Sequence, residues 1–134
     1  SVKALIKNGR VYSTDVCLPI SKITECVKFA EEETKKFGLR APMVGHLGDG
    51  NFHVILPYDP LKKETYKKIR EFSDLLIKKT LELNGTITGE HGIGLHKKDY
   101  LIKEHGDNIP VMKSIKRTID PNNIMTPEKI FDIN

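Results

Sequence analysis

The segment VGHLGDGNFHVIL, residues 44–56, constrains the fold more than any other part of the chain. Asp49-Gly50 is a strong signal for a tight turn between antiparallel strands, and apolar residues flank it on both sides. We therefore predict a β-hairpin over residues 42–57. A two-residue turn places His46 directly opposite His53, with Cβ atoms about 4.5–5.5 Å apart on one face of the sheet. The same register puts Val44 and Ile55 on the histidine face, and Leu47, Phe52, Val54 and Leu56 on the other.

The elements predicted around this hairpin indicate an α+β fold. Residues 11–20 alternate like a strand, and apolar residues at helical spacing follow over 21–38, where the first residue, a serine, is a good N-cap. Asp59-Pro60 opens a second helix that ends at Asn84-Gly85, and GTITG over 85–89 supplies a fourth strand. This order predicts a ferredoxin-like antiparallel sheet with helices on one face. The histidine face then needs cover from elsewhere.

The totals agree with one domain. The chain has 134 residues, of which 38% are hydrophobic, enough for a modest core, so we predict a single domain over 1–134 with a C-terminal helical tail from Pro110 to Ile119. No apolar run approaches the ~20 residues of a membrane span. The net charge of +4 is spread among acidic residues, so nucleic-acid binding is not predicted. Cys17 and Cys26 match no disulfide or zinc pattern.

A second polar cluster, TITGEHGIGLHKK over residues 86–98, adds Glu90 and His91 to the hairpin histidines. Adjacent residues of an extended chain point opposite ways, so Glu90 could join a metal ion while His91 faces another part of the cavity. Two histidines and a carboxylate suit several divalent metals, and the ligand set does not choose among them. Each cluster alone has a commoner structural meaning: histidines that satisfy backbone groups, and a solvated Glu-His turn.

Four strings carry a family resemblance: STDVCLPIS, GHLGDGNFH, TGEHGIGLHK and IDPNNIMTPEKIF. In this order they resemble the C-terminal part of the FAD-linked D-2-hydroxy-acid dehydrogenases, which are flavoproteins of the vanillyl-alcohol-oxidase type. The cytochrome-linked D-lactate dehydrogenases are the most similar subfamily. The resemblance runs from about Val11 to the end of the chain. It implies that residues 1–134 are a fragment of the substrate domain, and that the N-terminal FAD-binding domain is absent.

The resemblance also implies roles for five residues. His46, His53 and Glu90 correspond to the ligands of a divalent metal, zinc or manganese, in relatives that bind one. His91 corresponds to the proposed base, which also contacts the substrate. Asn51 matches the motif as well, which implies a polar contact with the substrate or the FAD cofactor.

The implied reaction is oxidation of D-lactate, or a similar small D-2-hydroxy acid, to the 2-oxo acid. The metal assists substrate binding, His91 removes a proton, and a hydride passes to FAD held mainly by a separate domain or subunit. Electrons then pass to an acceptor such as cytochrome c or a quinone. The implied location is mitochondrial in a eukaryote, otherwise cytoplasmic or peripheral to the inner membrane. The fragment is expected to be inactive alone, and a homodimer through the histidine face is a further expectation.

The sequence departs from its relatives at three positions. Thr126-Pro127 stands where the family usually has Asn-Pro. Ser13 and Ile55 stand near positions where 2-hydroxyglutarate-oxidising relatives have lysine and asparagine, which favours a small monocarboxylate.

Two other classes of function remain open from the residues. The first is a self-sufficient metal-dependent hydrolase, in which His46, His53 and Glu90 activate water. The second is a ferredoxin-like binding module without catalysis, in which the histidines are structural. Metal-dependent activity without flavin would favour the first, and steeply salt-dependent nucleic-acid binding would favour the second.

Overall fold

The computed structural model describes residues 9–133 of the chain. It divides between Glu90 and His91 into two compact units, and each is considered by itself. The first unit contains the sheet and two long helices, and the second contains two shorter helices. Among the described residues, no helix is both long and apolar enough to cross a membrane.

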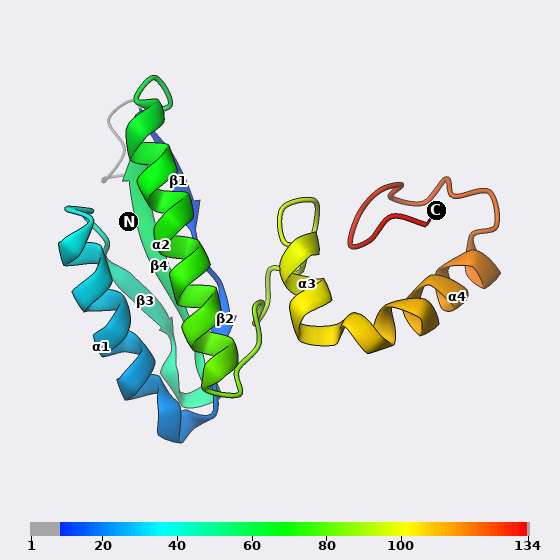
Figure 1. Ribbon diagram of the computed structural model, residues 1–134, viewed down its shortest axis with the longest axis horizontal. Coiled ribbons are helices and arrows are strands. Elements are labelled where there is room, and N and C mark those ends of the chain that lie inside the picture. The colour runs from blue at the N-terminus through cyan, green and yellow to red at the C-terminus, as the bar shows by residue number, and fades with distance from the viewer. Residues whose placement is uncertain (1–8, 134) are drawn as a thin grey trace. The chain divides into compact units, whose positions relative to one another are not determined.

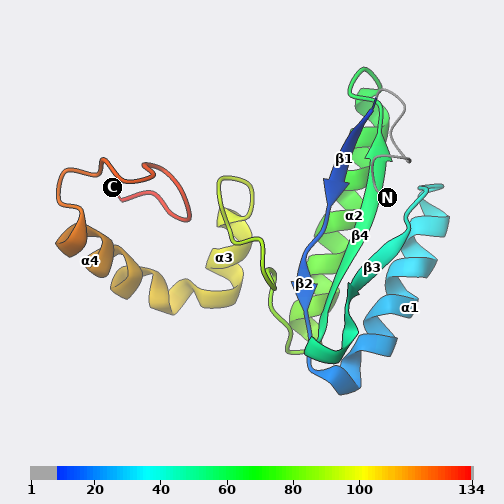
Figure 2. The ribbon, with the colours of Figure 1, turned by 180° about the vertical axis from the view of Figure 1, so that it is seen from behind.

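The sheet of the first unit is built around β4 (Asn51–Tyr58), which is its longest strand. β3 (Met43–His46) pairs antiparallel with one edge of β4. β1 (Arg10–Ser13) and β2 (Val16–Cys17) pair antiparallel with its other edge. Figure 2 shows these strands from the side opposite the helices.

β1 and β2 form one edge strand that is interrupted in the middle. Ser13 at the end of β1 lies opposite Ile55, and Val16 at the start of β2 lies opposite Phe52, so both strands keep the same register against β4. The two residues between them are therefore still aligned with the central strand. The two residues of this interruption, Thr14 and Asp15, belong to the candidate functional site.

α1 (Ile20–Lys36) and α2 (Lys63–Glu82) cover the same face of the sheet (Figure 1). The core lies between these helices and the strands, because every second residue of a strand points to the same face. The buried residues of this core are Val16, Leu18, Ile23, Cys26, Ala30, Phe52, Val54, Leu56, Ile69, Phe72, Leu76 and Leu83. Ile69, Phe72 and Leu76 of α2 lie at helical spacing, and all three belong to this core.

The predicted α+β fold is confirmed, with one strand reduced. The segment 85–89 does not form a full fourth strand; a single bridge joins Thr86 to Cys17. That bridge lies on the outer side of β2, where the fourth strand of a ferredoxin-like sheet belongs. The pairing stops because the next residues turn to contact Asp15 instead, through Thr88 and Glu90.

Both long helices begin at other residues than predicted. α1 begins at Ile20 with Pro19 as its N-cap, not Ser21, and no side chain caps it. Asp59 forms a turn through the Leu61 amide, and α2 begins only at Lys63. The second helix therefore begins three residues after Pro60, because the Asp59 side chain stabilises a turn ahead of it.

The hairpin exists, but its predicted register is wrong. A short 3-10 turn, η2 (Leu47–Asp49), and Gly50 connect the strands, so the loop has four residues. His46 therefore pairs with Asn51, and His53 pairs with Val44. The shift is two residues, so the faces are preserved: both histidines remain on the face away from the helices, in diagonal rather than direct opposition.

The second unit contains α3 (Lys98–His105), a 3-10 turn η3 (Gly106–Asn108) and α4 (Ile109–Ile119). The predicted helix over 110–119 is confirmed by α4. α3 was not predicted from the sequence; it is only eight residues long and buries Tyr100 and Leu101. A helix this short shows too few turns for a periodic pattern to stand out.

Candidate functional site

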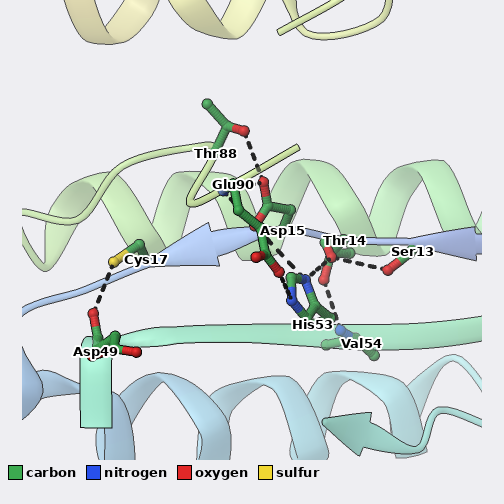
Figure 3. Close-up of polar contacts among 9 residues, drawn as sticks. All are labelled: Ser13, Thr14, Asp15, Cys17, Asp49, His53, Val54, Thr88 and Glu90. Carbon is green, nitrogen blue, oxygen red and sulfur yellow. Dashed lines mark hydrogen bonds and ion pairs between the residues drawn. The ribbon is translucent and has the colours of Figure 1, made fainter. Parts of the chain in front are cut away.

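The candidate site lies on the face of the sheet away from α1 and α2. Along β4, Phe52 and Val54 point into the core, so Asn51 and His53 between them point to the opposite face. Both of these polar residues are nevertheless buried, with 7% of their surface exposed. Figure 3 shows the residues that surround His53, which come from the interrupted edge strand and from the segment after α2.

His53 is held at both ring nitrogens. Its Nδ1 lies 3.0 Å from the backbone carbonyl oxygen of Thr14, and its Nε2 lies 2.8 Å from Glu90 Oε1 (Figure 3). A carbonyl only accepts hydrogen bonds, so Nδ1 carries the proton and donates it. Nε2 faces the Glu90 carboxyl group, and in the absence of a metal ion a proton lies between these two atoms as well. Metal-binding histidines commonly show this arrangement, with one nitrogen donating to a backbone carbonyl and the other turned to the ion.

Asp15 is a further polar residue of the site, and it was not predicted from the sequence. Its side chain is 1% exposed. It accepts hydrogen bonds from Thr88 Oγ1 at 2.8 Å and from the Glu90 amide at 3.1 Å, and Oδ1 lies 3.7 Å from His53 Nδ1. A charged residue inside a β-rich run was the available signal, since such residues are rarely buried unless paired.

Asn51 contributes a buried acceptor that nothing in the described part of the chain satisfies. No donor among residues 9–133 reaches its Oδ1, although the atom is shielded from solvent. Gly89 lies directly against this carboxamide, because a Cβ at position 89 would come within 2.7 Å of it. Only glycine allows the segment after α2 to pass so close to Asn51. Buried polar atoms without partners are rare and mark places where a ligand or water binds.

The structure brings together some of the predicted site residues and leaves others apart. His53 and Glu90 are in direct contact, and Asn51 lies two residues along β4 from His53. His46 is exposed at the end of β3, where it pairs with Asn51. His91 is exposed and is the first residue of the second unit. One peptide bond joins it to Glu90, which fixes their Cα atoms about 3.8 Å apart.

The first unit offers donors of the kinds that bind divalent cations, an imidazole nitrogen and a carboxylate. His53 Nε2 and Glu90 Oε1 are 2.8 Å apart, which is a direct hydrogen-bond distance, so an ion bound by both would move them apart by a few tenths of an ångström. His46 lies on the same face in the diagonal position, which long side chains can span. The unsatisfied Asn51 Oδ1 fits a hydrogen-bond donor, either a substrate hydroxyl or a flavin ring N–H.

These features define an α+β domain with a cluster of buried polar residues on the face of its sheet away from the helices. Comparison with known families specifies the class: residues 2–130 match the family described as FAD linked oxidases, C-terminal domain. The chain belongs to this family.

Curated relatives agree over nearly the whole chain. The mitochondrial cytochrome-type D-lactate dehydrogenase of Kluyveromyces lactis is 40% identical over 128 residues, 95% of this chain and 22% of the relative. A probable mitochondrial D-lactate dehydrogenase of Danio rerio is 38% identical over 131 residues, 97% and 26% of the two chains. A glycolate oxidase subunit of Bacillus subtilis is 36% identical over 118 residues, 87% and 25%. The chain thus spans about a quarter of the length of these relatives.

Proposed function

We propose that the chain is the substrate-domain part of an FAD-dependent D-2-hydroxy-acid dehydrogenase, which oxidises D-lactate or a similar small 2-hydroxy acid. The observation that carries this proposal is the 2.8 Å pair of His53 and Glu90 beside the unsatisfied Asn51 Oδ1. Family membership and the D-lactate dehydrogenases among the relatives support it. The shared substrate class of these relatives is a small 2-hydroxy acid, and glycolate is one as well.

His46, His53 and Glu90 are the proposed ligands of a divalent metal ion, zinc or manganese. When bound, the ion supplies Lewis acidity, which lowers the pKa of the substrate's hydroxyl and orients the substrate. Nδ1 of His53 donates to the Thr14 carbonyl and orients the ring, and a bound ion would displace the proton between Nε2 and Glu90.

His91 is the proposed base that removes the hydroxyl proton, and Asn51 the proposed contact to the substrate or flavin. His91 directly follows Glu90 in the chain, so it stays near that proposed ligand. Its exposure leaves the imidazole accessible to a substrate. FAD, held mainly by a domain or subunit outside this chain, supplies the hydride acceptor when bound.

The electron acceptor and the cellular location are inferred from the names of the relatives. The names of the eukaryotic relatives place them in mitochondria and name cytochrome as a partner of some. We extend both to this chain if its source is eukaryotic. Ser13 and Ile55 lie opposite each other on β1 and β4, and neither side chain has a charge to hold a second carboxylate, which supports a monocarboxylate substrate.

Metal binding is the first test. Calorimetric titration of zinc and manganese into the chelator-treated chain is expected to show binding near one ion per chain. His53→Ala and Glu90→Ala should abolish it, and His105→Ala, a histidine outside the site, should not. Loss of binding in all three variants, or in none, would contradict the proposed ligand set.

Activity requires the flavin-binding part of the enzyme. The chain combined with the FAD-binding part of a relative is expected to reduce an artificial electron acceptor with D-lactate and not with L-lactate. His91→Gln should reduce kcat by about 10²–10⁴-fold, the usual contribution of a general base, while metal binding persists. An unchanged kcat in this variant would remove His91 from the proposed mechanism.

A further inference from the structure

The interruption between β1 and β2 departs from ordinary antiparallel pairing at one residue. Thr14 and Val54 occupy a hydrogen-bonded position of the ladder, where each backbone normally donates to the other's carbonyl. The Thr14 amide does donate to the Val54 carbonyl at 3.1 Å. The Val54 amide, however, donates to the Thr14 side chain Oγ1 at 2.9 Å. The hydroxyl of Thr14 thus takes the place of its own carbonyl in the ladder.

This exchange releases the Thr14 carbonyl for the site. The released oxygen accepts the His53 Nδ1–H bond at 3.0 Å, and also a bond from Ser13 Oγ at 3.2 Å. If the Val54 amide used the carbonyl, that oxygen would lie in the plane of the sheet between the strands, away from the imidazole. The Thr14 hydroxyl is therefore what allows a backbone group to orient His53.

The next residue orients the second group of the pair. Asp15 accepts hydrogen bonds from the Glu90 amide and from Thr88 Oγ1, and so attaches the segment after α2 to the edge strand. Glu90 Oε1 then reaches His53 Nε2. Asp15 is almost completely buried, as a positioning carboxylate needs to be if its geometry is to be fixed.

We infer that Thr14 and Asp15 are positioning residues: Thr14 directs the imidazole of His53, and Asp15 places Glu90 opposite it. Each acts through the group that it orients. This inference rests on the proposed function for its consequence, metal affinity. Its geometric content, the state of the His53 ring, is independent of any metal.

The Thr14 half is tested with two matched variants of the chain. Thr14→Val keeps the shape of the side chain and removes its hydroxyl. The Val54 amide must then donate to the Thr14 carbonyl, and His53 Nδ1 loses its acceptor. Thr14→Ser keeps the hydroxyl and should behave like the wild type. In the metal-free wild type, long-range ¹H–¹⁵N NMR spectra should show a protected proton on His53 Nδ1. This signal should persist in Thr14→Ser and be lost or strongly shifted in Thr14→Val.

Metal affinity provides the second readout. Changing a residue that orients a metal ligand typically weakens metal binding 10–100-fold, and we expect this loss for Thr14→Val with zinc or manganese. Thr14→Ser should bind nearly as the wild type does. The Val54 amide should remain protected from exchange in both variants, which shows that the sheet is intact. Equal behaviour of the Val and Ser variants would overturn the role of the hydroxyl.

The Asp15 half is tested by Asp15→Asn against Asp15→Ala. Asparagine keeps an acceptor for the Glu90 amide and can donate to the Thr88 hydroxyl, so it should retain metal affinity, whereas alanine should lose 10–100-fold. An equal loss in both variants would mean that the charge matters and not the placement, which would overturn this half.

The outcomes separate this inference from the proposed function. A wild type that binds no metal, but shows the Nδ1 proton and its dependence on the Thr14 hydroxyl, would refute the metal site and keep the positioning of His53. A wild-type imidazole with no proton on Nδ1 would overturn the inference directly. That measurement needs no variant, so it stands even where Thr14→Val fails to fold.

Discussion

The two units use amphipathic helices in different ways. In the first unit, Ile69, Phe72 and Leu76 of α2 lie at helical spacing, and each is 0% exposed. In the second unit, Val111, Ile115 and Ile119 of α4 have the same kind of spacing but are 56–70% exposed. Helical periodicity therefore indicates that a helix has an apolar face. It does not indicate that other residues of the same unit cover that face.

The interactions that stabilise the two units differ in the same way. The first unit places a sheet beneath both of its helices, so its stability comes from buried apolar surface. The described part of the second unit buries few apolar side chains, mainly Tyr100 and Leu101 of α3. Polar contacts connect its segments, such as Lys98 to Asp132 at 2.6 Å and the Ile130 amide to the Gly94 carbonyl at 2.8 Å. The candidate site rests on the sheet of the better packed unit, which can fix its geometry.

The largest expected effect comes from truncating one apolar residue in each helix. Phe72→Ala should lower the free energy of unfolding by about 3–5 kcal/mol, because it removes a fully buried ring and leaves a cavity. Ile115→Ala should stay within about 0.5 kcal/mol, because its side chain is already exposed. Urea unfolding followed by circular dichroism measures both.

The two losses in free energy of unfolding together test the contrast between the units. A loss of several kcal/mol on Ile115→Ala would show that the apolar face of α4 is covered in solution, and the contrast between the units would disappear. A small loss on Phe72→Ala would instead mean that the core of the first unit repacks around the cavity.

Glycines offer a smaller test of the same contrast. Gly50 and Gly94 both have positive φ angles, +84° and +57°. Alanine in this region costs about 1–2 kcal/mol from backbone strain alone. At Gly50 the new Cβ would also come within 2.2 Å of the Leu18 carbonyl oxygen, whereas at Gly94 nothing lies within 4 Å. Gly50→Ala should therefore destabilise more than Gly94→Ala in thermal unfolding, and equal losses would mean that the hairpin turn relaxes.

Most of the fold could be predicted because its signals are local. The strands, the two long helices and the hairpin follow from periodicity and from turn residues that act within a few positions. The hairpin register could not be predicted in this way. Asp49-Gly50 is equally compatible with a two-residue turn and with the four-residue loop that forms, in which Gly50 alone adopts the left-handed conformation. Packing of Phe52 against the core fixes the face, and a shift of two residues leaves that face unchanged.

The candidate site was partly predictable for a related reason. His53, Glu90 and Asn51 stand out as polar residues in apolar or glycine-rich strings, and the structure places them close together. Thr14 and Asp15 were missed because their roles depend on distant partners: Thr14 on a strand about forty residues away, and Asp15 on a segment more than seventy residues away. A threonine in a strand looks ordinary until the partner of each backbone group is known. Such roles follow from hydrogen-bond accounting and not from residue type.

The smallest expected effect concerns the polar contacts of the second unit. Asp120, which follows α4, accepts hydrogen bonds from the Ile124 and Met125 amides at 3.0 and 2.9 Å and contacts the Lys116 ammonium. The hydrogen bond from Lys116, followed by those from the two amides, holds the pKa of Asp120 below its usual value. The stabilisation is therefore present above the pKa of the unfolded state, and is lost as the pH falls through the lower pKa of the folded state.

Acid should accordingly loosen this turn before it affects the core of the first unit. Between neutral pH and pH values below about 4, the amide NMR signals of Ile124 and Met125 should shift with the protonation of Asp120. Those of Phe72 and Leu76 should stay constant, because apolar burial carries no proton dependence. Asp120→Asn should remove the pH dependence of the turn signals. If the α2 signals shifted at the same pH, the two units would lose structure together. The contrast between apolar packing in the first unit and polar contacts in the second would then not hold in solution.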